Sequence, residues 1–358
     1  MKRAAIIIGA AATLWGCSTD LDINAPYKDI TVVYGLLNTR DSVQYVKINK
    51  AYLGEGDAYV FAQIPDSNEW GNSINLAKVH RVVNGVRQAS FDLRDTLITN
   101  REPGDFYSPE QTVFKFEDTF RETVLQNGQP VTLYLDEDAD YELELEVKGQ
   151  PVSSTTSIVN DFSFQAADQS LTIPVNLMNG SNYSSFELNW NSNRDGKRYV
   201  AEYRFNYKEV RGSDTTELLT ITQRLGTQVS TSSTTNQPMA ATVEGLQFFN
   251  TLINVIPDDP TVSKRIFLGL DFVVSVANDE FHTYLTLTEP VSGIIEDRPT
   301  YSNVTNGYGI FGSRYNKYII GKNLGPTTMA ELVDGNITAN LRFCTAIPID
   351  VNSPYYCP

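Results

Sequence analysis

The chain has 358 residues, and its 43 acidic against 28 basic side chains give a formal net charge of −15 at pH 7. That charge argues against nucleic acid as a partner, because phosphate binding needs a basic face, and it disfavours direct adhesion to anionic lipid. The length favours two domains over one, and with 41% hydrophobic residues each domain can bury a core of its own.

Residues 1–16 have the form of a bacterial export signal. Lys2 and Arg3 precede residues 4–16, a run that holds no charged side chain. A positive n-region followed by a short apolar h-region is typical of a cleaved signal peptide. The run is shorter than the roughly 20 apolar residues that a membrane-spanning helix needs. We therefore expect an exported protein that is not held by a spanning segment here.

The residues around Cys17 resemble the lipobox of bacterial lipoproteins, in which the cysteine is acylated and becomes the new N-terminus. Leu14 and Gly16 stand three and one places before it. Each buried CH₂ of an acyl chain contributes roughly 0.8 kcal/mol, and more than one chain gives stable anchoring. Cys17 is thus predicted to attach the protein to membrane lipid, with residues 17–27 as a tether. The alternative is a plain export signal with an unmodified cysteine.

Residues 28–160 are predicted to form an antiparallel β domain. In the stretch YELELEVKG, apolar or aromatic side chains alternate with charged ones: Tyr141, Leu143, Leu145 and Val147. This is the pattern of a strand with one face on a core and one face in water. Asn84-Gly85 separates two further strand-like runs and suits a two-residue hairpin turn.

The start of the YELELEVKG strand matches the tyrosine corner of immunoglobulin-like sandwiches, in which a tyrosine hydroxyl bonds to upstream backbone. Tyr141 is predicted to have that role. PVSSTTSIV would be the last strand, and IVNDFSFQ, near residues 158–165, has the character of a short linker. The first domain is therefore expected to be an immunoglobulin-like β-sandwich over residues 28–160.

Residues 161–343 are predicted to form a larger β-sandwich or barrel with a helical insertion. Its expected strands are FELNW, YVAEYRFNYKEV, ELLTITQRL, FLGLDFVVSVA, TYLTLT and YIIGKN. Asp195-Gly196 is predicted to join the first two of them as a hairpin. Apolar residues recur at helical spacing over residues 243–256, and TMAELVDGN is expected to be a second short helix, capped by Gly335.

Residues 344–358 form a C-terminal tail that holds the remaining two cysteines, Cys344 and Cys357. Exported proteins meet an oxidising compartment in which paired cysteines form disulfides. Closing a loop of about 13 residues contributes roughly 3 kcal/mol in the chain-entropy account. A disulfide that pins the tail is the prediction, and two free thiols are the alternative.

Four features taken together carry a family resemblance: VVYGLLNTRDSVQYVKINKAYLGEGD, YELEL with the Ser/Thr-rich strand after it, NGYGIFGSRY, and the cysteine tail. They resemble an uncharacterised family of Bacteroidota outer-membrane lipoproteins. The resemblance implies an immunoglobulin-like N-terminal domain, a second β domain, outer-membrane attachment, and genes that often lie beside those of TonB-dependent transporters. It implies no catalytic residue and no cofactor. Asp20 and Asp22, just after Cys17, resemble that phylum's signal for export to the cell surface.

Histidine catalysis is disfavoured, because the chain has only two histidines, His80 and His282, in different predicted domains. A Ser-His-Asp triad needs a histidine beside both partners. Both histidines lie in strand-like runs, and His80 is expected to point outward. A glycoside hydrolase with two carboxylates stays open as an alternative, because acidic residues are abundant. The protein is expected not to be an enzyme.

Asp136, Asp138 and Asp140 stand at alternate positions, the spacing of the first three ligands of a calcium loop. An EF-hand would also need Gly at its sixth and Glu at its twelfth position, where this sequence has Tyr141 and Val147. These residues are therefore expected to form a solvated acidic turn, and a looser calcium site is the alternative.

The stretch YSNVTNGYGIFGSRYNKYIIG, residues 301–321, is the main candidate for binding. Its aromatic side chains stand among four glycines: Tyr301, Tyr308, Phe311, Tyr315 and Tyr318. Aromatic rings beside flexible backbone can stack on sugars or anchor in a partner surface. The favoured alternative is that these rings fill the core of the second domain. Trp70, in the polar stretch DSNEWGNS, is a second candidate for an exposed aromatic.

These observations predict a non-enzymatic, cofactor-free lipoprotein at the surface of the outer membrane. Its expected work is that of an accessory subunit on an outer-membrane β-barrel protein, such as a TonB-dependent transporter, which the family resemblance alone suggests. A surface glycan-binding module is the second hypothesis.

Overall fold

The computed structural model describes the chain over six stretches: residues 30–51, 57–126, 129–231, 235–289, 300–347 and 350–357. The predicted signal peptide, Cys17 and the tether lie outside the described residues. Within these stretches the protein is mainly β, as expected. No helix in the described part of the chain has the length and apolar character needed to cross a bilayer.

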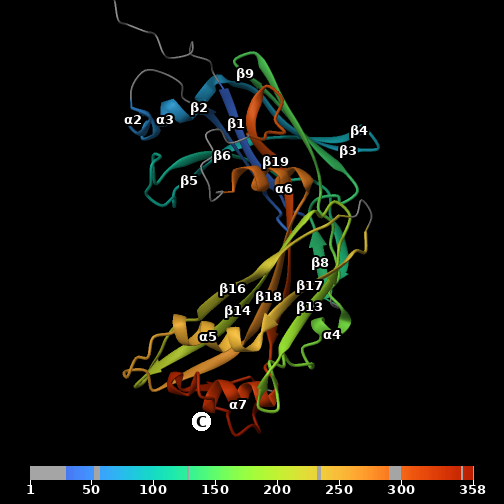
Figure 1. Ribbon diagram of the computed structural model, residues 1–358. Helices are drawn as coiled ribbons and strands as arrows, with labels where there is room; N and C mark the ends of the chain where they lie inside the picture. Colours follow the sequence, from blue (N-terminus) through green and yellow to red (C-terminus); the bar gives the residue numbers. More distant parts are fainter. Residues whose placement is uncertain are drawn as a thin grey trace, which may run out of the picture.

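One open sheet of ten strands extends through both halves of the molecule (Figure 1). Its main path is β15-β14-β18-β19-β1-β2-β6-β5, with β16 also paired to β14 and β20 to β18. These strands are β1 Ile30–Leu37, β2 Gln44–Ala51, β5 Arg94–Ile98, β6 Gln111–Phe116, β14 Arg198–Arg211, β15 Asp214–Thr215, β16 Leu219–Val229, β18 Lys264–Ala277, β19 Gly307–Lys322 and β20 Phe343–Thr345. No closed barrel forms among the described strands.

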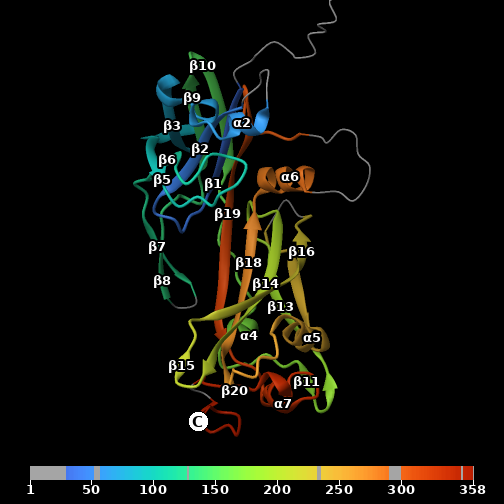
Figure 2. The same cartoon turned by 90° about the vertical axis from the view of Figure 1, so that its left-hand side faces the viewer.

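Strand β19 joins the two halves of this sheet, and Figure 2 shows it passing from the upper half to the lower half. Residues 307–313 pair in parallel with β1, whereas residues 314–322 pair antiparallel with β18. The sequence pattern predicts that all of these residues belong to the second domain, whereas β19 pairs with strands of both halves. The close approach to β1 requires glycine, since Gly309 has φ +109° and a Cβ there would lie 1.9 Å from the Val33 carbonyl oxygen.

The upper half is a two-layer sandwich. The sheet β10-β9-β3-β4 packs against β1, β2, β6 and the first part of β19. Its strands are β3 Ile74–Val83, β4 Val86–Asp92, β9 Asp140–Val147 and β10 Gln150–Ser157. The predicted alternation in β9 is confirmed, because Tyr141, Leu143, Leu145 and Val147 are all buried. The Asn84-Gly85 turn between β3 and β4 is confirmed as well, with positive φ at both residues.

Tyr141 makes the bond to upstream backbone that the sequence predicts. Its hydroxyl accepts a hydrogen bond from the backbone N–H of Asp136 at 3.0 Å and donates one to the Asp118 carboxylate at 2.7 Å. Arg81 pairs with the same buried carboxylate at 2.7 Å. The corner of the chain before β9 is thereby fixed to the core.

The lower half packs β14, β18 and the second part of β19 against a two-stranded sheet and two helices. These further elements are β13 Ser185–Asn191, β17 Pro238–Glu244, α5 Gly245–Val255 and α7 Pro326–Asp334. The core is rich in aromatic rings. The ring of Phe205 lies with its centroid 5.0 to 5.9 Å from four others, those of Tyr207, Phe248, Phe267 and Phe343.

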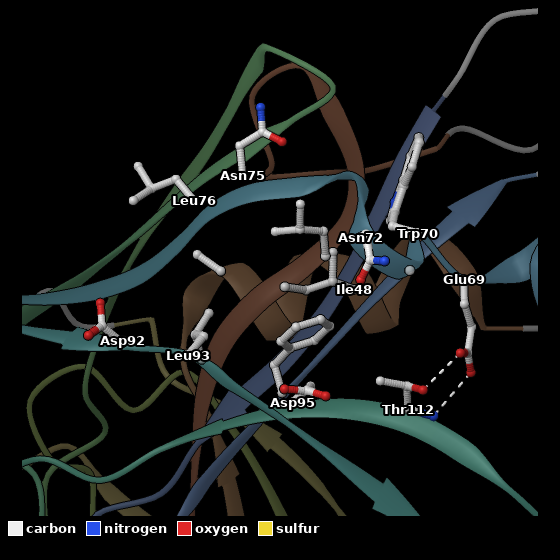
Figure 3. Close-up of a pocket in the computed structure, with 14 residues that line it drawn as sticks. Ile48, Glu69, Trp70, Asn72, Asn75, Leu76, Asp92, Leu93, Asp95 and Thr112 are labelled. Atoms are coloured by element: carbon white, nitrogen blue, oxygen red, sulfur yellow. Dashed lines mark hydrogen bonds between the residues drawn. The ribbon is translucent and has the colours of Figure 1, made fainter.

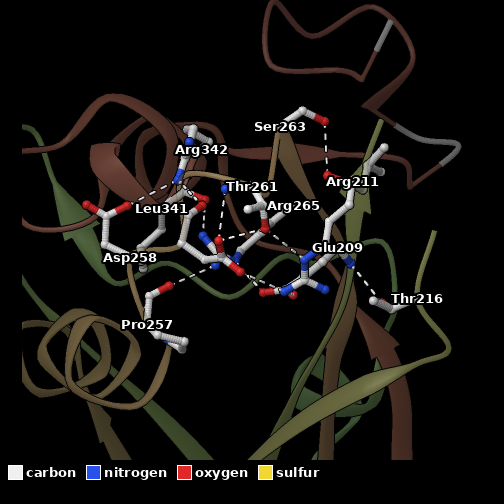
Figure 4. Close-up of polar contacts among 12 residues, drawn as sticks. Glu209, Arg211, Thr216, Pro257, Asp258, Thr261, Ser263, Arg265, Leu341 and Arg342 are labelled. Atoms are coloured by element: carbon white, nitrogen blue, oxygen red, sulfur yellow. Dashed lines mark hydrogen bonds and ion pairs between the residues drawn. The ribbon is translucent and has the colours of Figure 1, made fainter. Parts of the chain in front are cut away.

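A fully buried arginine lies at the end of the lower core (Figure 4). The Arg265 guanidinium donates to the Glu209 carboxylate and to the carbonyl oxygens of Leu341 and Pro257, each at 2.9 Å. Arg211 contacts the other Glu209 oxygen at 2.7 Å. All of the nitrogens of this buried side chain therefore have partners, as a charge out of water requires.

The remaining elements are short. They are α2 Ala58–Ala62, α3 Pro65–Asn68, the 3-10 turns η2 Gly71–Ser73 and η3 Ala339–Leu341, β7 Glu122–Gln126, β8 Gln129–Leu133, α4 Ala166–Gln169, β11 Met178–Asn179, β12 Asn182–Tyr183 and the longer α6 Asp279–Thr288. The predicted helix near residues 243–256 corresponds to α5, and the Gly335 cap of α7 is confirmed.

Two local predictions are wrong. Asp195-Gly196 is not a hairpin turn, because β13 pairs with β17 while β14 pairs with β16 and β18. TYLTLT is not a strand but part of α6, which begins where the Asn278 side chain accepts a hydrogen bond from the Phe281 N–H at 3.1 Å. The N-cap hydrogen bond stabilises the helix, and this outweighs the β propensity of TYLTLT.

The predicted linker near residues 158–165 is instead a buried junction. Ile158 packs in the upper core and its neighbour Val159 in the lower core. Lys317 of β19 contacts the Asp161 carboxylate at 2.7 Å and donates to the Phe162 carbonyl oxygen. The Glu137 carboxylate accepts the Asp161 N–H at 3.2 Å. The two halves therefore meet through packed and charged groups.

Candidate functional site

The outer face of β1 and β2 carries a row of side chains that the sandwich does not bury. Because successive residues of a strand point to opposite faces, Val33 enters the core while Val32 and Tyr34 face outward. The antiparallel register places Asn49 beside Val32 and Lys47 beside Tyr34. This row forms the floor of a groove of about 440 Å³.

The walls of the groove come from α2 and from the loop before β6. Tyr59 of α2 is 70% exposed and Phe106 of the loop is 49% exposed. The loop is attached to the helix, since Gln63 donates to the carbonyl oxygens of Gly104 and Asp105 at 3.0 and 2.9 Å. We call this feature the aromatic groove.

Lys47, on the floor of the aromatic groove, lies near a second cation, Arg101. Burial, followed by the nearby Arg101, lowers the pKa of Lys47. The Arg101 guanidinium lies 5.4 Å from the centroid of the Phe106 ring and donates to the Tyr107 carbonyl at 3.0 Å. Neither cation forms an ion pair with any residue that the structure describes. The nearby Glu69 carboxylate accepts instead from the Thr112 N–H and hydroxyl.

The third aromatic ring of the groove, that of Tyr34, contacts Tyr284 of α6. The ring of Tyr34 lies 6.4 Å from that of Tyr284, edge to face. Burial and the hydrogen bond with Tyr284 raise the pKa of Tyr34 to about 12. Tyr34 nevertheless keeps 43% of its surface exposed, so it remains available to a partner.

A second cavity, of about 580 Å³, opens between the two layers of the upper sandwich (Figure 3). Apolar side chains line its inner part: Ile48, Ile74, Leu93 and Phe114. Asn72, Asp92 and Asp95 line it as well, and Lys78 pairs with Asp92 at 3.1 Å. Polar groups beside an apolar surface suit a ligand with several hydroxyl groups.

Trp70 contributes to this second cavity but is not the exposed aromatic that the sequence suggested. It is 6% exposed, and its indole N–H donates to the Asn49 carbonyl at 2.9 Å. The ammonium groups of Lys50 and Lys148 lie 5.8 and 5.5 Å from the ring centroid. This packing leaves little of the indole face for stacking on a sugar.

The aromatic residues of 301–321 do not gather into one surface. Phe311 is buried in the upper core and Tyr315 in the lower core. Tyr308 is 51% exposed and lies beside Val32 in the parallel register of β1 and β19. Tyr301 is partly buried. The stretch thus combines both alternatives of the sequence analysis, core filling and an exposed ring.

One histidine lies in a strand as the sequence predicts, and the other does not. His80 is buried, and its ring nitrogens contact the Ser90 hydroxyl at 2.7 Å and the Glu144 carboxylate at 2.8 Å. It stands on the outward face of β3, as predicted, because its neighbour Val79 faces the core, and it is covered there by Ser90 on β4 and Glu144 on β9. His282 lies in helix α6.

The aspartates before β9 and the two C-terminal cysteines lie within the described residues. Asp136 accepts the Asp138 N–H at 3.0 Å, and the Asp138 carboxylate pairs with Arg194 at 2.6 Å. Among the described residues no cluster of three acidic, histidine or cysteine side chains is arranged to hold a metal ion. Cys344 and Cys357 form the predicted disulfide, with their Cα atoms 5.2 Å apart.

Three aromatic residues of the groove were not among the predicted binding residues: Tyr34, Tyr59 and Phe106. Tyr34 lies in an apolar run, and the alternation that puts it outside is visible only once Val33 is known to face the core. The segment AYVFAQI around Tyr59 did carry a signal, because it is apolar yet follows Asp57, an N-cap residue, and precedes Pro65.

Comparison with protein-family models finds no match to this chain, and comparison with curated proteins finds none either. Among solved structures, the chain is similar to the C-terminal globular domain of an oligosaccharyltransferase from Pyrococcus abyssi, with 10% identity and a TM-score of 0.23. That match covers 69% of this chain and 48% of the other. A likeness at this level carries no argument about function.

Proposed function

We propose that the protein is a non-enzymatic lipoprotein of the outer membrane, anchored through acylated Cys17 and exposed at the cell surface. Its work is that of an accessory subunit that binds an integral outer-membrane β-barrel protein. The anchor rests on the lipobox resemblance, and the transporter class of the partner rests on the family resemblance. The aromatic groove supplies the surface for the contact.

The observation that carries this proposal is the exposure of Tyr34, Tyr59 and Phe106 around one groove. Aromatic side chains bury a large area and lose little conformational entropy, so they anchor protein interfaces well. A tether also raises the effective concentration of the protein for partners in the same membrane, so a modest contact area is enough.

The same proposal includes an immunoglobulin-like fold for residues 28–160. The hydrogen bond from the Asp136 N–H to the Tyr141 hydroxyl supports it, because this is the bond of a tyrosine corner. In addition, residues 307–313 of β19, which lie outside residues 28–160, pair with β1 and extend its sheet.

The test is affinity purification from detergent-solubilised outer membranes. We expect the wild-type protein to recover one β-barrel protein in stoichiometric amount. The double variant Tyr59→Ala, Phe106→Ala should recover at least tenfold less of it. Tyr318→Ala, which removes an aromatic that is 39% exposed elsewhere on the protein, is the matched control and should recover the wild-type amount. Recovery of the lipoprotein alone would contradict the proposal.

The second cavity favours one other function, glycan binding. Its Asn72, Asp95 and Thr112 side chains lie beside the ring of Phe114. Hydroxyl groups of a sugar would bond to the polar groups while its apolar face packs on the ring. Binding of the wild-type protein to a member of a polysaccharide panel, lost in Asp95→Ala, would select this function. No binding across the panel would remove it.

A further inference from the structure

Helix α2 and the residues after it expose several large apolar side chains. The segment 58–64, AYVFAQI, holds no charged residue in a chain in which 20% of residues are charged. Tyr59, Val60 and Ile64 are 70%, 58% and 41% exposed, and no residue of α2 is buried. Contiguous apolar exposure of this kind marks a contact surface in a stable protein.

The backbone of this segment is firmly held although its side chains are exposed. Asp57 caps the helix by accepting the Tyr59 N–H at 2.9 Å. The Asn68 side-chain amide donates to the carbonyl oxygens of Phe61, Ala62 and Ile64 at 3.2, 3.0 and 3.0 Å. The apolar side chains are therefore presented on a satisfied backbone and need no refolding to make a contact.

This surface lies at the end of the molecule where the predicted tether enters. Ile30, the first residue of β1, pairs with Ala51 at the end of β2. Ala51 lines the aromatic groove together with Ala58 and Tyr59. Cys17 is 13 residues before Ile30, and a fully extended chain of that length spans at most roughly 45 Å. An anchor at Cys17 therefore leaves α2 within reach of the bilayer.

We propose that the 58–64 segment inserts its side chains into the interfacial region of the membrane that carries the anchor. This inference rests on the proposed anchor. Tyrosine beside aliphatic side chains is the composition that the boundary between headgroups and acyl chains favours. An uncharged segment also makes this contact without the repulsion that an acidic chain meets at an anionic surface. The aromatic groove then opens beside the membrane, where an integral partner is within reach.

The test places one fluorophore on each of two equally exposed valines of the lipidated protein. Val60→Cys and Val86→Cys remove side chains that are both 58% exposed, and Val86 lies in the β3–β4 hairpin, on the far side of the upper half in Figure 1. The disulfide cysteines do not react with a maleimide, and acylated Cys17 does not either. Each protein carries nitrobenzoxadiazole (NBD) and is reconstituted in phosphatidylethanolamine and phosphatidylcholine vesicles with and without doxyl-labelled lipid.

We expect the doxyl lipid to quench NBD at position 60 at least threefold more than NBD at position 86, with a blue-shifted emission at position 60 only. Equal quenching at the two positions in protein that floats with the vesicles overturns the lipid contact and leaves the anchor intact. Protein that does not float, with an unmodified Cys17 thiol by mass spectrometry, overturns the anchor and the lipid contact with it. Circular dichroism of both labelled proteins, compared with wild type, establishes that they are folded.

Discussion

The lower half of the protein encloses a dense aromatic core, whereas the upper half both buries aromatic rings and exposes several around one groove. In the lower half, rings such as Phe205 and Phe248 are buried among other rings, and even an arginine is enclosed with its partners satisfied. In the upper half, Tyr34, Tyr59 and Phe106 are exposed, and cavities of about 440 and 580 Å³ open at the surface. The lower half thus concentrates buried residues that stabilise the fold, and the upper half carries the aromatic groove and the second cavity.

Strand β19 carries both kinds of aromatic side chain. Tyr308 is 51% exposed, whereas Tyr315 is fully buried. The difference follows the face of the strand, because Phe311 in the upper half is buried like Tyr315 and Tyr318 in the lower half is exposed like Tyr308. Four predictions test the comparison, in order of decreasing effect.

The largest loss of stability is expected from Arg265→Ala in the lower core. It leaves the Glu209 carboxylate and the carbonyls of Leu341 and Pro257 without their donor, which lowers the free energy of unfolding by about 3 to 5 kcal/mol. Urea titration followed by circular dichroism measures this. Arg94→Ala, at an exposed arginine of β5, is the control and should stay within about 0.5 kcal/mol of wild type. Similar losses in both variants would refute the stabilising role of the buried network.

The pair Tyr315→Ala and Tyr308→Ala compares a buried and an exposed ring of β19 directly. Loss of the buried ring should lower the free energy of unfolding by about 3 to 4 kcal/mol, because a cavity remains in the lower core. Loss of the exposed ring should change it by less than about 0.5 kcal/mol. The same urea titration measures both. If Tyr308→Ala destabilised the protein as strongly, the upper ring would have a packing role and the contrast would fail.

The disulfide should contribute about 3 kcal/mol, since it closes a short loop in the unfolded chain. The double variant Cys344→Ser, Cys357→Ser removes the bond between residues 13 apart in the sequence. Its midpoint in a thermal scan should equal that of the wild-type protein measured in a reducing agent. A wild-type midpoint unchanged by reduction would mean that the bond does not stabilise the fold.

The smallest effect concerns pH and the junction between the halves. Burial, followed by the neighbouring Asp161, raises the pKa of Glu137 from its ordinary value of 4.5 to about 7. The folded state therefore binds a proton more tightly than the unfolded state, so stability falls as pH rises from 4.5 to 7. We expect a decrease of roughly 2 kcal/mol, less than the full shift would give because the site is partly exposed to solvent.

Glu137→Gln should remove this part of the pH dependence, because glutamine does not titrate. The measurement is the free energy of unfolding in urea at several pH values between 4.5 and 7. Equal slopes for the wild-type protein and the variant would show that Glu137 titrates normally. The difference between the slopes isolates this group from other titrating residues, such as Glu280.

Local patterns in the sequence were enough to determine several elements. The alternation in residues 141–147 fixed the buried face of β9, and Asn84-Gly85 fixed its neighbouring hairpin. Gly335 ended α7, and the cysteine pair was placed correctly. Each of these depends on residues that are close in the sequence, where backbone preferences and side-chain period act directly.

Tertiary structure alone decided which surfaces the protein presents. The parallel pairing of β1 with residues 307–313 joins segments far apart in the sequence, and no local pattern encodes such a contact. That pairing places Phe311 with the upper core, whereas Tyr315 of the same strand lies in the lower core. The exposure of a side chain depends on what packs against its strand, so the aromatic groove became visible only when distant segments were brought together.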